Sequence, residues 1–133
     1  GDGIAQPATL DELLAVSDIV SLHLPLTEET RHLLDRETLG RMKRGVVLVN
    51  TARGGLIEEA ALVEALRSGH VRAAGLDVFD REPLSSGNPL LSLANVVVMP
   101  HLSWLTAETL DKFRDGDLLA FSDKMMQIHA PEN

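Results

Sequence analysis

A chain of 133 residues, with 44% hydrophobic and 24% charged residues, has the size and composition of one globular domain with a single core. Its formal net charge of −8 argues against nucleic acid as a partner, because binding a phosphate backbone needs clustered Lys and Arg. The absence of cysteine excludes disulfides and Cys-ligated metals and favours a reducing, cytoplasmic setting. No apolar run approaches the roughly 20 residues of a membrane-spanning helix, so we expect no membrane partner.

The first part of the chain predicts a helix, a strand and two short helices. Thr9 is followed three residues later by a glutamate and by leucines at helical spacing, the capping pattern of a helix start. The apolar run 19–24 predicts a buried strand, which Pro25 ends because proline cannot donate to a central ladder. The segments 27–34 and 35–42 each open on a capping residue, and each predicts a short helix.

The rest of the chain continues the alternation. Gly45 is expected to end the second short helix, and the mostly β-branched run 46–49 predicts a parallel strand covered on both faces. The remaining predicted elements are a helix over 57–66 that stops at Ser68-Gly69, strands over 71–78 and 96–99, and a final helix from Thr106. Strands alternating with helices indicate an α/β fold with a doubly wound parallel sheet and flanking helices. We expect residues 1–133 to form one domain.

Charged residues follow three of the predicted strands. Arg53 follows the second strand, Glu82 the third and His101 the fourth. Ligands of open α/β sheets bind beyond the carboxyl ends of the strands. The three residues are therefore expected at one edge of the sheet.

Four runs of sequence carry a resemblance to a known family. They read L-H-L-P-L-T-x-x-T, V-N-T-A-R-G-G-L-I, A-G-L-D-V-F-x-x-E-P-L and P-H-L-S-W, in this order along nearly the whole chain. Together they resemble the successive signatures of the D-isomer-specific 2-hydroxyacid dehydrogenases. The resemblance implies a Rossmann-type domain and hydride transfer between NAD or NADP and a small 2-keto or 2-hydroxy acid, such as hydroxypyruvate or glyoxylate.

The resemblance also implies three catalytic roles, and the residue types suit them. Arg53 would hold the substrate carboxylate, because its planar guanidinium can pair with both carboxylate oxygens. His101 would be the acid/base, since a protonated imidazole can neutralise the oxygen on which charge develops. Glu82 would orient His101 and favour its charged form.

Cofactor contacts are implied in the same way, and no metal site is predicted. The contacts would be His23, Leu24, Pro25 and Thr30 near the adenosine, Thr51, Ala52 and Arg53 along the nicotinamide ribose, Asp77 at the carboxamide, and His101, Ser103 and Trp104. Simpler interpretations remain open for some of them. Asp77 could bond a neighbouring turn, and His23 could be a packed strand-end residue. Gly54 and Gly55 are interpreted as the turn into the next helix.

Two features of the family's dinucleotide domain are missing from the sequence. It contains no G-x-G-x-x-G turn, and the acidic residue that would bind the ribose diol is also absent, so NAD and NADP cannot be distinguished. We interpret the chain as the C-terminal part of such a domain, without the glycine loop and the substrate domain, and expect weak NADH binding by the chain alone. The strand 19–24 would then be an open edge, which favours a homodimer.

Two alternatives stay open. The chain could be a non-catalytic, nucleotide-sensing or interaction module like the corepressors that share this fold and its three residues. It could also be a complete protein that needs a partner to supply the missing strand.

Overall fold

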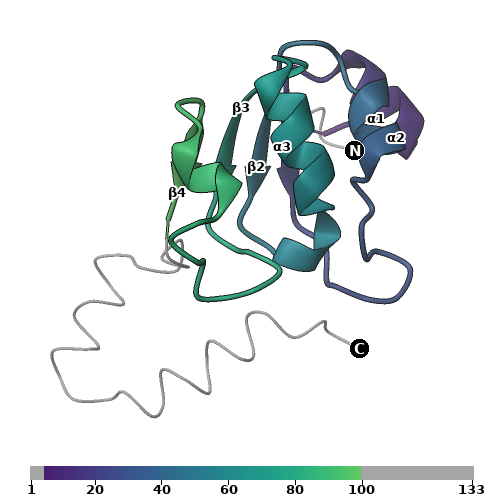
Figure 1. Ribbon diagram of the computed structural model, residues 1–133. Coiled ribbons are helices and arrows are strands. Elements are labelled where there is room, and N and C mark those ends of the chain that lie inside the picture. Colours follow the sequence, from purple (N-terminus) through teal and green to yellow (C-terminus); the bar gives the residue numbers. More distant parts are fainter. Residues whose placement is uncertain (1–4, 100–133) are drawn as a thin grey trace, which may run out of the picture.

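The structure, a computed structural model, describes residues 5–99 (Figure 1). Within this range four parallel strands form one sheet in the order β1-β2-β3-β4. The strands are β1 (Ile19–Leu22), β2 (Val46–Asn50), β3 (Val71–Leu76) and β4 (Val96–Val98). The helices are α1 (Leu10–Val16), α2 (Arg36–Arg41) and α3 (Glu59–Arg67), with 3-10 turns η1 (Gly54–Leu56) and η2 (Pro89–Ser92). The predicted α/β class is confirmed.

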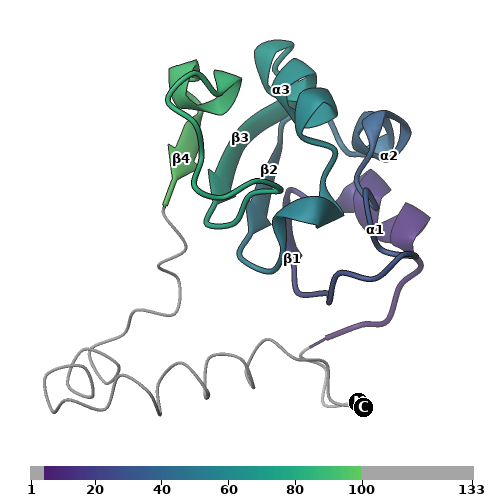
Figure 2. The same ribbon diagram turned by 60° about the horizontal axis from the view of Figure 1, so that its bottom comes forward.

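The core lies between the sheet and helices α1, α2 and α3, which cover one of its faces (Figures 1 and 2). Leu14 of α1, Leu39 of α2 and Leu62 of α3 are buried there in one hydrophobic cluster with Leu48 of β2. Side chains of β2 alternate between buried and half-buried, as expected when helices cover one face only. Within residues 5–99, the predicted coverage of β2 on both faces is therefore not seen.

Local capping signals fix the first helix and the turn after α3. At α1 the backbone N–H of Glu12 donates to the Thr9 hydroxyl at 3.3 Å, and the Glu12 carboxylate accepts from Thr9 N–H at 2.9 Å. This is the predicted capping box. Gly69 follows α3 with φ 75°, a left-handed conformation that favours glycine. Gly45 also has a positive φ, but α2 already ends at Arg41, so Gly45 instead turns the chain into β2.

The predicted helix over 27–34 is wrong, because this segment forms turns. The hydroxyls of Thr27 and Thr30 accept hydrogen bonds from each other's backbone N–H groups, which is the pattern of a helix N-cap, but only turns follow it. His32 adopts φ 51°, outside the helical range. Leu34 then pairs in a parallel bridge with Ile57, so a long-range contact requires extended backbone where the local pattern predicts a helix.

Other predicted boundaries shift slightly. Strands β1 and β3 both end two residues before the predicted ends at 24 and 78. The predicted final helix from Thr106 lies outside the described residues. Over residues 5–99, no helix combines the length and the hydropathy needed to cross a bilayer.

Candidate functional site at the carboxyl edge of the sheet

The loops that leave β1, β2 and β3 gather at one edge of the sheet, at the bottom of Figure 1, and Figure 2 turns this edge forward. They carry most of the predicted site residues: His23, Leu24, Pro25 and Thr30 after β1, Thr51, Ala52 and Arg53 after β2, and Asp77 and Glu82 after β3. The other predicted residues, His101, Ser103 and Trp104, follow β4 and lie outside the described residues.

The turn after β2 is held by a side chain that the sequence prediction missed. Asn50 is 1% exposed; its Nδ2 donates to the Arg53 carbonyl at 2.9 Å, and its Oδ1 accepts from Ala52 N–H at 3.1 Å. Arg53 is half-buried, and its Nη1 donates to the Ala52 carbonyl at 2.8 Å. The sequence does contain one signal for this role. An asparagine ends an apolar run, and a polar side chain that is buried there needs hydrogen-bond partners.

The loop after β3 carries two of the predicted acidic residues in different environments. Asp77 is completely buried, and its backbone N–H donates to the Asn50 carbonyl at 3.1 Å. Glu82 is exposed, and its Oε1 accepts from Phe79 N–H at 3.0 Å. The Glu82 carboxylate is thus folded toward its own loop, which fixes where this charge lies.

The β2 and β3 loops touch through their backbones. A Cβ atom on Gly54 would lie 1.9 Å from the Phe79 carbonyl carbon and 2.3 Å from the Asp80 nitrogen. A Cβ on Gly55 would lie 2.8 Å from a methyl group of Leu26, so the loop after β1 joins the same packing. The two glycines form the turn η1, as predicted, and close approach of backbone atoms requires glycine at position 54.

The loop after β1 is organised by its own side chains. The Thr30 hydroxyl donates to the Pro25 carbonyl at 2.7 Å, and the His23 Nε2 lies 2.9 Å from the Ser21 hydroxyl. Arg31 forms an ion pair with Asp80 at 3.6 Å, which links this loop to the one after β3. Thr30 therefore shapes the loop whatever ligand lies against it.

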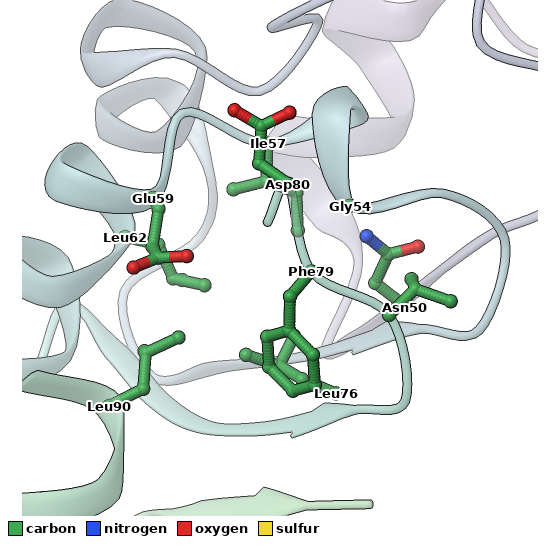
Figure 3. A pocket seen from close by; sticks show the side chains of 10 residues that line it. Asn50, Gly54, Ile57, Glu59, Leu62, Leu76, Phe79, Asp80 and Leu90 are labelled. Carbon is green, nitrogen blue, oxygen red and sulfur yellow. The ribbon is translucent and has the colours of Figure 1, made fainter. Parts of the chain in front are cut away.

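A small pocket lies beneath the β2 and β3 loops (Figure 3). Its volume is about 10 Å³, about the space that one water molecule needs, so it is too small for a ligand of the size of a 2-keto acid. Asn50 and Gly54 lie on one side of it, opposite Glu59 and Leu90. The carboxylate of Glu59 would repel an anionic acid, so a 2-keto acid does not fit here.

The exposed side of the edge has the chemistry of a dinucleotide surface. Leu24 is 39% exposed beside the exposed Pro25, an apolar surface suited to a ring. Thr51 and Ala52 are small and half-buried, and the Arg53 guanidinium donates to the Ala52 carbonyl. Apolar surface next to a few placed polar groups is typical of cofactor sites, so these residues fit part of a nicotinamide dinucleotide.

A parallel α/β sheet with polar loops at its carboxyl edge defines the nucleotide-binding class of domain. Residues 2–103 match the family model described as D-isomer specific 2-hydroxyacid dehydrogenase, NAD binding domain. The chain belongs to this family, in its NAD-binding domain.

Relatives agree with this assignment. The chain is 57% identical over 104 residues to D-3-phosphoglycerate dehydrogenase of Mycobacterium bovis. The matched residues are 78% of this chain and 20% of that protein. The chain is 50% identical over 105 residues to glyoxylate/hydroxypyruvate reductase B of Serratia proteamaculans, covering 79% and 32%.

A solved structure has the same fold at 53% identity, with a TM-score of 0.68 over 70% of this chain and 30% of that one. It is a D-isomer specific 2-hydroxyacid dehydrogenase from Xanthobacter autotrophicus Py2 in complex with NADPH and MES. The chain thus spans between a fifth and a third of the length of these relatives.

Proposed function

We propose that this chain provides the second half of the dinucleotide-binding domain of a D-2-hydroxyacid dehydrogenase, and that residues 1–133 form one domain. The observation that carries the proposal is the contact between the Arg53 loop and the Glu82 loop at the carboxyl edge, in a chain of this family. The reaction is the reversible reduction of a small 2-keto acid with NADH or NADPH.

In this proposal three side chains divide the chemistry. The bound nicotinamide supplies or accepts the hydride. Arg53 pairs with the substrate carboxylate and aligns its carbonyl group. His101 donates a proton to the carbonyl oxygen, and Glu82 favours the charged imidazole and fixes its orientation.

The cofactor lies along the same edge. Its adenosine side contacts His23, Leu24, Pro25 and Thr30, its nicotinamide ribose contacts residues 51–53, and its carboxamide is recognised by Asp77, with further contacts from His101, Ser103 and Trp104. The exposed surface of Leu24 and the half-buried Thr51 support this placement. One relative was solved with NADPH, whereas the family is described as NAD-binding. NADH and NADPH should therefore be compared as cofactors by experiment.

The substrate is proposed to be glyoxylate or hydroxypyruvate, as in the name of the Serratia relative. The Mycobacterium relative is named for D-3-phosphoglycerate, so this compound is the alternative substrate to test in the assay. We further propose a cytoplasmic homodimer, a proposal supported by the exposed apolar side chain of Ile19 on edge strand β1.

The test is turnover by the complete polypeptide that contains these residues. We expect oxidation of NADH or NADPH with glyoxylate or hydroxypyruvate, to be compared with NAD reduction by D-3-phosphoglycerate. Replacing His101 with Gln should lower kcat by about 10²- to 10⁴-fold, the usual contribution of general acid/base catalysis.

The matched control is His70→Gln. His70 precedes β3 at the opposite end of the sheet, and in the described structure its buried Nε2 makes no hydrogen bond. This variant should keep kcat. Cofactor binding without turnover of any of the three acids would instead favour a nucleotide-sensing module, and a fully active His101→Gln variant would rule out the assigned acid/base.

A further inference from the structure

Asn50 is a buried polar side chain to which the proposed chemistry gives no role. It is the last residue of β2 and is 1% exposed. A buried amide without partners would destabilise the fold, and its partners in the described structure lie in one turn. Both atoms of its carboxamide bond to the backbone of residues 52 and 53.

The geometry requires an amide at this position. Nδ2 donates to the Arg53 carbonyl at 2.9 Å while Oδ1 accepts from Ala52 N–H at 3.1 Å. An ionised carboxylate has two acceptors and no donor, so it would leave the Arg53 carbonyl facing another oxygen. An aliphatic side chain would leave both backbone groups unpaired.

The same residue ties this turn to the loop after β3. The Asn50 carbonyl accepts from Asp77 N–H at 3.1 Å. Gly54, next to Arg53, packs on the backbone of Phe79, and Phe79 N–H holds the Glu82 carboxylate at 3.0 Å. A displacement of the Asn50 turn would therefore move the arginine relative to the glutamate.

We propose that Asn50 is a positioning residue, whose carboxamide clamps the turn carrying Arg53 at a fixed place relative to the Glu82 loop. The clamp itself is independent of the reaction, but its catalytic consequence rests on the proposed function. An Arg53 backbone released from the clamp no longer holds the guanidinium in one place, and misplacement by about 1 Å can cost about 10²-fold in rate.

The first test is Asn50→Asp in the complete polypeptide. At neutral pH, kcat/KM for the keto acid should fall by about 10- to 100-fold. As the pH is lowered, the introduced carboxyl group gains a proton and again offers one donor and one acceptor. The ratio of variant to wild-type kcat/KM should then rise, which a general loss of stability would not produce.

The matched control is Asn95→Asp. Asn95 is a half-buried asparagine that also donates its Nδ2 to backbone carbonyls, those of Leu66 and Arg72, at 3.1 and 3.2 Å. It precedes β4, away from the carboxyl edge. Its replacement should lower thermal stability and leave kcat/KM within about twofold of wild type, because residues that share no partner act independently.

A readout without turnover separates the clamp from the reaction. Hydrogen exchange of the Ala52 amide, followed by NMR, should be slow in the wild type and in Asn50→Asp, which keeps an acceptor, and at least about tenfold faster in Asn50→Ala. If the wild type reduces no keto acid, the proposed function fails while this measurement still tests the clamp.

Two results would overturn the proposal. One is equal Ala52 exchange in wild type and Asn50→Ala. The other is an active wild type whose Asn50→Asp variant keeps full kcat/KM at every pH. Should Asn50→Ala fail to fold, Asn50→Asp and Asn95→Asp still test the proposal. The measurement is then the pH dependence of kcat/KM of each variant relative to that of the wild type.

Discussion

Two glycines in the described part of the chain have opposite surroundings, so replacing each with alanine should change stability in opposite directions. A Cβ on Gly54 would meet the Phe79 backbone at 1.9 Å, whereas a Cβ on Gly40, within α2, has nothing within 4 Å. Gly54→Ala must push two backbones apart, and we expect the free energy of unfolding to fall by about 1–3 kcal/mol. Gly40→Ala should raise it by about 0.5–1 kcal/mol, because alanine suits a helix interior better.

Urea denaturation of both variants measures this difference. A Gly54→Ala variant as stable as the wild type would mean that the two loops are not in contact. At the residue scale, this contact could not be predicted from sequence, because Gly54 and Phe79 lie in separate loops and nothing local to either indicates the other. Asn50 was missed for a related reason, since the apolar run before it gives no indication of its partners.

Within α2, the first turn depends on a charged cap. Thr38 N–H donates to Asp35 Oδ1 at 2.9 Å, and the Thr38 hydroxyl accepts from Asp35 N–H at 2.7 Å. The hydrogen bond from the Thr38 backbone N–H is the main cause that lowers the pKa of Asp35 below its ordinary value of 3.8. The ionised cap therefore stabilises the helix.

The sign of the pH dependence follows from this lowered pKa. The contribution of Asp35 to stability is fully present above the unfolded value of 3.8 and is lost as the pH falls through the lower folded value. Asp35→Asn still accepts a hydrogen bond but cannot titrate. Urea unfolding from pH 7 to below the folded pKa should show the gap between wild type and variant shrinking, and a constant gap would contradict the assignment.

At the element scale, the structure was predicted correctly where it depends on neighbouring residues and incorrectly where it depends on long-range contacts. The capping residue Thr9 and the left-handed Gly69 act within a few residues, so their sequence patterns were sufficient. The segment 27–34 was misassigned because its shape depends on a bridge between Leu34 and Ile57. The alternation of strands and helices predicted a parallel sheet, and the four parallel strands confirm it. His101 remains a prediction because it lies outside the described residues.

At the scale of the whole molecule, the sheet face away from the helices presents several apolar side chains among the described residues. Ile19 on β1 is 65% exposed and Val97 on β4 is 66% exposed, with half-buried Val47 and Val49 between them on β2. An exposed apolar surface of this kind favours association. We expect the 133-residue chain to self-associate with increasing concentration in sedimentation velocity.

Val97→Lys should reduce this association by placing a charge on that face. Val16→Lys is the control, because Val16 is 71% exposed but belongs to α1, in the helical layer. Equal effects of the two lysines would show that association does not involve the sheet face. A monodisperse monomer at every concentration would contradict the proposed homodimer.

The backbone contact of Gly54 with Phe79 also limits how this fold can be re-engineered. Exchanging a single loop with that of a relative, a common route to new substrate preference, would insert a foreign backbone against an unmatched surface. The β2 and β3 loops should therefore be transplanted together, as one cassette taken from one donor. A library that varies the two loops independently should therefore consist mostly of mismatched combinations.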